Sequence, residues 1–378
     1  MGTVMVKHVT VIGGGNGGSA AAADLSLRGF KVAWYEVPEF ESNVAEAVRR
    51  KGIDLEAAPA SGLTSGFVEI DTITTDIEKA LVNSELVIVI VPAFAQDRIA
   101  QLCAHHLRDE HIIVLMPGNF GGAIRFQQVL HECGCNKKLT LAETETLIYG
   151  CRKKTPDSIS INGYKGELGL AAFPASDTDR VLATFRQLYP AARRLPNVLV
   201  AGLSNANFLL HLPVVLGNLS NIENGVDVPF YGHGMTPAIG RIIDAIEAER
   251  MTLQTVGIQL RPLLDILKGY YGHQGGAGNT IWEFCRNGSV YARNKMPKTL
   301  NHRYLLEDMP YGLIPMLKLL EQVGLPGTHT KSIVDTLCTA SGVNLYDTAR
   351  DLKKLRLDQL SATTLLEFVT VSGRSTNT

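Results

Sequence analysis

Polar residues at helical spacing interrupt an apolar segment in the second half of the chain. The segment SNANFLLHLPVVLGNL, residues 204–219, contains Asn207, His211 and Asn218 at intervals of four and seven residues. Such intervals put side chains on one face of a helix. Because an imidazole titrates near neutrality, this face could line a polar cleft and transfer protons. Hydrogen-bonded residues of a protein core would give the same pattern, and for one histidine on an apolar helix that structural explanation is favoured.

A second group of polar residues lies in the segment TLNHRYLLEDMPYGLIP, residues 299–315. Arg303 and Glu307 are four residues apart, so they could form a surface ion pair that contributes a few tenths of a kcal/mol. Alternatively, the planar guanidinium of Arg303 could bind a substrate carboxylate, and Asp308 could orient a histidine. The residues alone leave both explanations open.

A glycine-rich segment near the start of the chain predicts a dinucleotide site. Its glycines have the spacing G-x-G-x-x-G, which allows a tight turn, a close approach of the backbone to a pyrophosphate, and close packing of helix on strand. The phosphates would lie at the N-terminus of the helix that follows. The residues predicted to contact the cofactor here are Gly13, Gly15, Asn16, Gly17, Gly18 and Glu36.

Glu36 ends the second apolar run, about twenty residues after the glycines, where an acidic side chain can accept both ribose hydroxyls. A carboxylate at this point repels a 2′-phosphate, and no arginine follows in residues 37–39. NADH is therefore favoured over NADPH. The alternative is a glycine-rich turn that binds nothing.

The elements around the glycines predict an α/β domain. Continuous apolar runs indicate parallel strands buried on both faces, and their alternation with helical stretches indicates a doubly wound, Rossmann-type sheet. We expect strands at 9–12, 31–35, 86–91 and 112–116, one ending near Glu143, and shorter β-like pieces over 148–173. Helices are expected at 16–27, at 39–51, at 76–82 with Thr75 as N-cap, from the end of the 117–122 loop to about 133, and at 178–188, with a further loop at 57–66.

Ligands bind such sheets beyond the carboxyl ends of the strands. This rule places Pro92, Ala93, residues 117–120 and Glu143 around the nicotinamide end of the cofactor. Pro92 and Ala93 are therefore further predicted cofactor contacts.

From Ser204 onward the periodicity is helical nearly to the end. We expect a Rossmann domain over residues 1–190 and an all-helical second domain over 191–378. Pro213 predicts a kink in the helix of His211, and Thr236 with Pro237 marks a helix start, followed by acids that read as a solvated face.

Composition narrows the class of protein. The 378 residues carry a net charge of −1, from 36 basic and 37 acidic residues, so neither nucleic acid nor an anionic membrane is an expected partner. Apolar stretches such as 86–95 have the length of a strand, too short to span a bilayer.

Six scattered cysteines fit reduced thiols and a cytoplasmic location. Cys133 and Cys135 beside His131 make a poor zinc site, so no metal is expected.

Five segments together resemble the octopine/opine dehydrogenase family: GGGNGGSAAAADLSLRG, AETET, NANFLLHLPVVLGN, FYGHGMTP with AER, and LNHRYLLEDMPYGLIPM. Within that family the chain looks most like the bacterial N-(1-D-carboxyethyl)-L-norvaline dehydrogenases. The resemblance implies a Rossmann domain and a helical domain with the active site in the cleft between them. It also implies reductive condensation of an L-amino acid with a 2-oxo acid, usually pyruvate. The reductant would be NADH or NADPH, and NADPH is less favoured for this chain.

The resemblance also implies roles for individual residues. His211 matches the family's catalytic histidine, Asp308 its partner, and Arg303 an arginine that would bind a substrate carboxylate. The matching substrate-site residues are Glu143, which could receive the ammonium of the amino acid, and Asn207 and Asn218. Leu212 departs from the family's usual proline after the histidine. Glu145 and Tyr149 look particular to this chain and could bear on the choice of amine.

Two other functions stay open on the sequence. One is reduction of an oxo acid to a hydroxy acid, as in ketopantoate reductase or glycerol-3-phosphate dehydrogenase, which use a lysine of the helical domain. The other is a protein that binds NADH without turnover. The helical domain could also form a homodimer.

Overall fold

The computed structural model describes residues 5–288, 290–291 and 294–372. The chain divides into two compact units, Met1–Gly118 with Gly122–Val198, and Asn119–Gly121 with Leu199–Thr378. The division therefore lies after residue 198 rather than after 190. The reason is a short strand, β12 (Ala192–Arg194), which pairs with β11 (Leu168–Phe173) and so belongs to the first unit.

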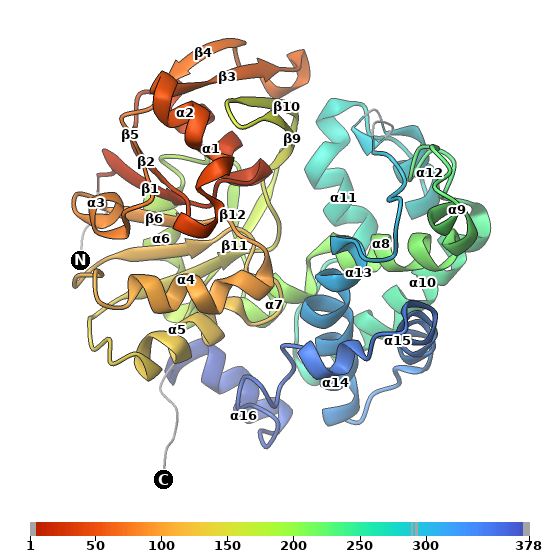
Figure 1. The fold of residues 1–378 in the computed structure, drawn as a ribbon. Helices are drawn as coiled ribbons and strands as arrows, with labels where there is room; N and C mark the ends of the chain where they lie inside the picture. Colours follow the sequence, from red (N-terminus) through yellow and green to blue (C-terminus); the bar gives the residue numbers. More distant parts are fainter. Residues whose placement is uncertain (1–4, 289, 292–293, 373–378) are drawn as a thin grey trace. The chain divides into compact units, whose positions relative to one another are not determined.

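The first unit contains the predicted mostly parallel sheet (Figure 1). Its strand order is β12-β11-β8-β7-β6-β1-β2-β5, and every pairing is parallel except that of β11 with β8. The remaining strands are β1 (His8–Ile12), β2 (Lys31–Tyr35), β5 (Thr72–Thr74), β6 (Leu86–Val89), β7 (Ile112–Leu115) and β8 (Thr140–Thr144). The strands β6, β7 and β8 are buried at every position, as the continuous apolar runs predict.

Helices alternate with these strands. They are α1 (Asn16–Leu27), α2 (Ala45–Arg50), α3 (Ile77–Leu81), α4 (Gln96–Cys103), α5 (Gly122–Glu132) and α6 (Thr178–Phe185). The helix α1 has the predicted bounds, and Gly29 follows it with a φ of 88°, which glycine adopts without strain. The N-cap of α3 is Asp76, whose carboxylate accepts from the N–H groups of Glu78 and Lys79, so the expectation of Thr75 was wrong.

A second, four-stranded sheet in the first unit was not predicted. Its order is β4-β3-β10-β9, with β3 (Gly52–Ala57), β4 (Gly66–Glu69), β9 (Tyr149–Thr155) and β10 (Ser158–Tyr164). The expected loop at 57–66 begins at the last residue of β3 and ends at the first residue of β4, with a 3₁₀ turn, η2 (Pro59–Ser61), between them. The expected helix 39–51 is a 3₁₀ turn, η1 (Pro38–Asn43), followed by α2, which ends before β3. These strands are half-polar and lack a continuous apolar run, so their pattern gives no sign of the strands with which they pair.

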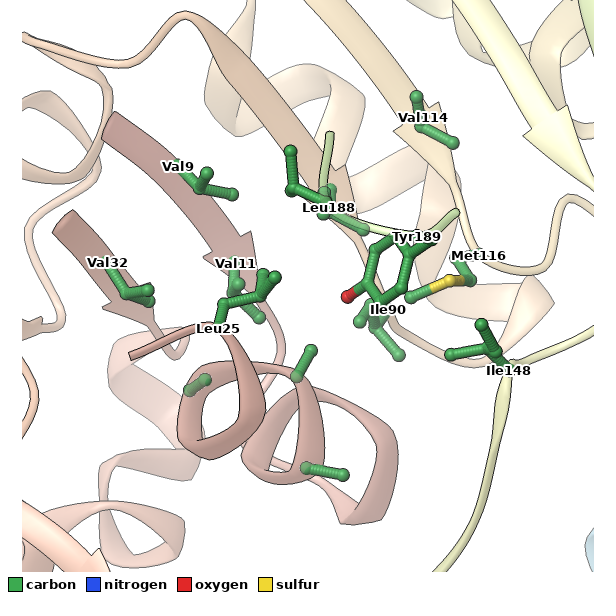
Figure 2. Packing of buried hydrophobic residues seen from close by; sticks show 14 of the residues in the cluster. Val9, Val11, Leu25, Val32, Ile90, Val114, Met116, Ile148, Leu188 and Tyr189 are labelled. Atoms are coloured by element: carbon green, nitrogen blue, oxygen red, sulfur yellow. The ribbon is translucent and has the colours of Figure 1, made fainter. Parts of the chain in front are cut away.

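The core of the first unit joins the large sheet to its covering helices. Val9 and Val11 of β1 and Val32 of β2 lie together with Leu25 of α1, and all four are fully or almost fully buried (Figure 2). Ile90 and Met116, which follow β6 and β7, belong to the same cluster. This packing fixes α1 against β1, so the loop between them has a defined geometry.

The second unit is helical, as predicted (Figure 1). Its main helices are α8 (Ala206–Leu216), α9 (Leu219–Glu223), α10 (Pro237–Thr252), α11 (Leu263–Tyr271), α12 (Ile281–Asn287), α13 (Arg303–Leu306), α14 (Ile314–Gln322), α15 (Thr328–Ser341) and α16 (Ala362–Glu367). A further helix, α7 (Val198–Leu203), precedes α8. The helix α8 continues through Pro213. The N-cap of α10 is Thr236, with Pro237 in the first turn, as expected.

The end of α10 corrects one prediction. Its last acid, Glu249, and Arg250 are buried, although the sequence favoured a solvated face. The Glu249 carboxylate accepts from the N–H groups of His329 and Thr330 at the start of α15, and the Arg250 guanidinium donates to the carbonyl of Leu203. The carboxylate of Glu249 thus binds the N-terminus of α15, and the guanidinium of Arg250 binds the C-terminus of α7. Backbone N–H and C=O groups at helix ends need such partners.

By length and composition, the segment 198–216 could cross a membrane. This finding contradicts the expectation that every apolar stretch of the chain is too short to span a bilayer. In the structure 94% of this window is buried inside the protein. Burial of this kind is what a helix of a protein core shows.

A buried histidine predicts acid sensitivity of the first unit. The Nδ1 of His111 accepts from the Arg108 N–H at 3.2 Å, and Nε2 lies 3.1 Å from the Ser84 carbonyl oxygen, an arrangement that fits the neutral ring. Burial and then the Arg108 guanidinium lower the pKa of His111 to about 4. Because the unfolded chain takes up this proton near the ordinary pKa of ~6.5, the stabilisation is complete above that pH and falls toward pH 4.

We therefore expect the free energy of unfolding to fall less between about pH 7 and pH 5 in His111→Gln than in the unmodified protein. Urea unfolding at each pH measures both values. The exposed His106 offers a control, since His106→Gln should leave the pH dependence unchanged. Equal slopes for His111→Gln and the unmodified protein would contradict the assignment.

Candidate functional site

The glycine loop between β1 and α1 has the geometry of a diphosphate cradle. Gly13 adopts a φ of 124°, and a Cβ there would lie 2.3 Å from the Ile90 carbonyl oxygen. A Cβ at Gly18 would lie 1.7 Å from the Gly13 oxygen, so helix and strand approach each other as closely as only glycine allows. The same holds at Gly17, where a Cβ would lie 2.7 Å from a side-chain carbon of Ile90.

Gly15 differs from these glycines, because a Cβ there would meet nothing within 4 Å. It is the N-cap of α1 and provides no side-chain cap, so a ligand can bind the first N–H groups of the helix, beginning with that of Asn16. Open space beside an uncapped helix N-terminus fits an anionic diphosphate. The predicted contacts Gly13, Gly15, Asn16, Gly17 and Gly18 thus lie together in this loop and in the first turn of α1.

Glu36 follows β2 and is held beside the loop. Its Oε2 accepts from the Gly14 N–H at 3.0 Å and from Asn43 Nδ2 at 2.9 Å, and its Oε1 accepts from the Val37 N–H at 2.9 Å. A carboxylate has about four acceptor positions, and three are used here. The arrangement leaves one position on Oε1 for a ribose hydroxyl.

Pro92 and Ala93 follow β6, which pairs with β1 in parallel. Pro92 is the N-cap of a 3₁₀ turn, η3 (Ala93–Ala95), and Ala93 is buried. The carboxyl ends of β1 and β6 are neighbours in the sheet, so both residues lie at the edge where such sheets bind ligands.

In the helical unit the structure brings His211 and Asp308 together. The Nδ1 of His211 lies 2.6 Å from Asp308 Oδ2, and both side chains are at most 10% exposed. Because an ionised carboxylate only accepts, Nδ1 is the donor and the ring presents Nε2 as its acceptor. This pair can therefore take up a proton at Nε2 and stabilise the resulting imidazolium.

Aromatic rings fix the plane of that imidazole. Tyr304 stacks on His211 with centroids 3.9 Å apart and an interplanar angle of 27°, while Phe230 meets it edge-on at 5.8 Å. Stacking and edge contacts on two sides of the ring therefore hold it in one orientation. Sequence reasoning missed Tyr304. Its place beside Arg303 was the only signal, because nothing in the sequence shows that α13 packs on α8.

Arg303 forms the ion pair that the sequence allowed. Its guanidinium lies 2.8 Å from Glu307 Oε2, with Arg303 57% exposed and Glu307 buried. A guanidinium has five N–H donors, so it can hold this pair and a substrate carboxylate together. The ion pair and the carboxylate-binding role are therefore compatible explanations.

The two asparagines flanking His211 have different surroundings. Asn207 lies one turn before His211 in α8 and is half-buried. Asn218 lies beyond the end of α8 as the N-cap of α9, so the single helical face was wrong for this residue. Its Nδ2 donates to the carbonyls of Val214 and Gly234, which gives Asn218 a structural role.

Glu143 is held by backbone groups of the first unit. It is fully buried in β8, and its Oε2 accepts from the Ala123 N–H at 2.7 Å, at the positive end of α5. This contact gives Glu143 a structural role, and its role toward a substrate ammonium stays a prediction. Glu145 is likewise buried and paired with Arg193, and the Tyr149 hydroxyl donates to Asp24 Oδ2 at 2.7 Å. Both side chains therefore have partners within the first unit.

Within the described ranges, no three His, Cys, Asp or Glu side chains are grouped to hold a metal ion. All six cysteines lie in those ranges, and no disulfide bond joins them.

Two family models match the chain. Residues 8–139 match the NAD-dependent glycerol-3-phosphate dehydrogenase N-terminus, and residues 194–341 match the NAD/NADP octopine/nopaline dehydrogenase alpha-helical domain. An opine dehydrogenase of Arthrobacter sp. (strain 1C) is 30% identical over 359 residues, which cover 94% of this chain and 97% of the relative. Protein ocs of Agrobacterium tumefaciens (strain Ach5) is 25% identical over 366 residues, with 96% and 98% covered.

Solved structures show the same fold. An octopine dehydrogenase in complex with NADH and agmatine has a TM-score of 0.77 at 20% identity, covering 96% of this chain and 98% of that one. An NADP⁺-bound yersinopine dehydrogenase has a TM-score of 0.67 at 14% identity, covering 98% and 99%. The resemblance to the norvaline enzymes in particular stays a prediction.

Proposed function

The chain belongs to the opine dehydrogenase family, and on that premise we propose that it condenses an L-amino acid with a 2-oxo acid and reduces the imine. The product is a secondary-amine dicarboxylate. The observation that carries this proposal is the buried His211–Asp308 pair in a chain that also has an open glycine cradle for a dinucleotide. The chain is accordingly an NAD(P)-dependent oxidoreductase acting on CH–NH donors.

The reaction requires proton transfers at the carbonyl oxygen and at the amine nitrogen. The amine adds to the carbonyl and the resulting carbinolamine loses water, which leaves an imine carbon that needs a hydride. A reduced nicotinamide held by the glycine loop and Glu36 would supply that hydride. His211 can protonate the departing oxygen from Nε2, while Asp308 holds Nδ1 and stabilises the imidazolium. Tyr304 keeps the ring in one orientation, so Nε2 points in a constant direction.

The substrates carry carboxylates, and Arg303 is the residue proposed to bind one of them. Pyruvate is the proposed oxo acid and an L-amino acid the proposed amine. Support comes from the octopine dehydrogenase structures, whose descriptions name NADH with L-arginine and NADH with pyruvate. The exposed guanidinium of Arg303 offers bidentate donors to such an anion.

We propose NADH as the preferred cofactor because the Glu36 carboxylate would lie against a 2′-phosphate. Glu36→Gln keeps the shape of the side chain and removes its charge. We expect the variant to bind NADH about tenfold more weakly and to lose most of its preference over NADPH. Fluorescence titration with each cofactor measures both dissociation constants.

Glu39→Gln is the control, because it removes the same charge three residues further along the chain. Glu39 is exposed and pairs with Arg98. Glu39→Gln should change neither constant. If the unmodified protein bound NADPH as tightly as NADH, the assignment to NADH would fail.

The function is tested by following NADH absorbance with pyruvate while L-amino acids are added singly. Oxidation that needs both the oxo acid and an amino acid supports opine formation. Oxidation with an oxo acid alone would show hydroxy-acid formation instead. NADH binding without oxidation across the panel would indicate a protein without turnover on these substrates.

A further inference from the structure

One ammonium group holds two of the three residues that donate hydrogen bonds to Glu36. Gly14 and Asn43 each donate to Glu36 Oε2, at 3.0 and 2.9 Å. The Nζ of Lys153 donates to the backbone carbonyls of the same two residues, at 2.8 Å to Gly14 and 2.6 Å to Asn43. Lys153, Gly14, Glu36 and Asn43 therefore form a closed ring of hydrogen bonds.

Lys153 reaches this ring from the second sheet. It lies in β9, where its backbone N–H donates to Asn16 Oδ1 at 2.8 Å, so the strand also holds the first residue of α1. The side chain is half-buried, and its Nζ lies 5.1 Å from the ring centroid of Trp34, an attractive arrangement for a cation. Contacts at both ends of the residue give Lys153 one defined position.

Two carboxylates, Glu36 and Asp157, act on this ammonium through their charge, and Asp157 itself is paired with Arg50. Burial lowers the pKa of Lys153 to about 8, although both carboxylates oppose that shift. We therefore expect Lys153 to lose its charge at mildly alkaline pH.

We propose that Lys153 is a positioning residue of the dinucleotide site, which acts through Glu36 to set the affinity for the adenosine ribose of the cofactor. The inference rests on the proposed function, because it assumes that this loop binds a nicotinamide dinucleotide. No glycine motif or strand pattern in the sequence indicates it, since the residue lies more than a hundred positions after the loop.

The first test is the dissociation constant for NADH of Lys153→Met, which keeps most of the length of the side chain and removes its ammonium group. We expect it to rise about tenfold, as for the loss of a charged hydrogen-bond donor. Lys154→Met is the matched control, since the neighbouring Lys154 is exposed and pairs with Glu56. It should bind NADH like the unmodified protein, and thermal melting checks that all variants are folded.

A double-mutant cycle separates action through Glu36 from general support of the fold. In a Glu36→Gln background, Lys153→Met should change the NADH constant by less than about threefold. In the unmodified protein the constant should also rise as the pH passes through 8, and this rise should be missing in Lys153→Met.

Additive effects of the two substitutions, or an unchanged constant in folded Lys153→Met, would overturn the inference. A protein that binds no NADH in any form would instead contradict the proposed function. Binding without turnover of amino acids would leave the role of Lys153 intact and limit the failure to the proposed reaction.

Discussion

Replacement of His211 by glutamine is expected to lower turnover by about 10²–10⁴-fold, the range that one positioned acid–base group contributes. Glutamine places a polar side chain beside Asp308 in place of the imidazole, but its amide cannot transfer a proton near neutral pH. The measurement is the rate of NADH oxidation at saturating pyruvate and amino acid. The NADH dissociation constant should stay the same, because the glycine loop and Glu36 belong to the other unit.

The control for this variant is His233→Gln, because His233 lies between two glycines in an exposed turn. Its substitution should leave turnover within about twofold of that of the unmodified protein. A His211→Gln enzyme with full activity would show that another group transfers the proton, and the role assigned to the His211–Asp308 pair would have to be abandoned.

Replacement of Gly15 by alanine is expected to weaken NADH binding about tenfold or more while the protein stays folded. The added methyl group meets no protein atom within 4 Å, and the φ of −78° at this residue suits alanine. It would instead occupy the space into which we place the diphosphate. The loss of a glycine N-cap and the reduced freedom of the unfolded chain oppose each other, so stability should change by no more than about 1 kcal/mol.

Gly272→Ala in the helical unit is a matched control. A Cβ there also meets nothing within 4 Å, and its φ is −56°. The two variants should melt at similar temperatures, and only Gly15→Ala should lose affinity for NADH in titrations. Unchanged affinity in Gly15→Ala would mean that the diphosphate does not approach the backbone at this point.

The glycine loop is the part of this protein that the sequence determined most completely. The residues from Val9 to Glu36 predicted a strand, a helix and a second strand, and α1 and β2 have the predicted bounds. Local rules are sufficient there, because a buried strand, a glycine turn and an alanine-rich helix each have a short-range signature. The alternation of such signatures also predicted the large parallel sheet and the helical second half.

The second sheet and the surroundings of single polar residues could not be predicted in this way. Pairing of β3 with β10 joins residues that are about a hundred positions apart, and their half-polar sequences carry no mark of the partner. Glu143 and Asn218 show the same limit. Both were reasonable substrate contacts by type and position, yet each is bound to backbone groups that the chain brings there from elsewhere.

The chemistry of the site divides along the same line. The sequence alone determined which residue types are present, namely a histidine, an aspartate, an arginine and an acid after the second strand. Only the tertiary structure decided that Asp308 meets Nδ1 of His211, that Tyr304 stacks on the ring, and that Lys153 completes the ring of hydrogen bonds around Glu36. Hydrogen bonds and ring contacts depend on distances of a few ångströms between distant segments, and packing of the whole chain sets those distances.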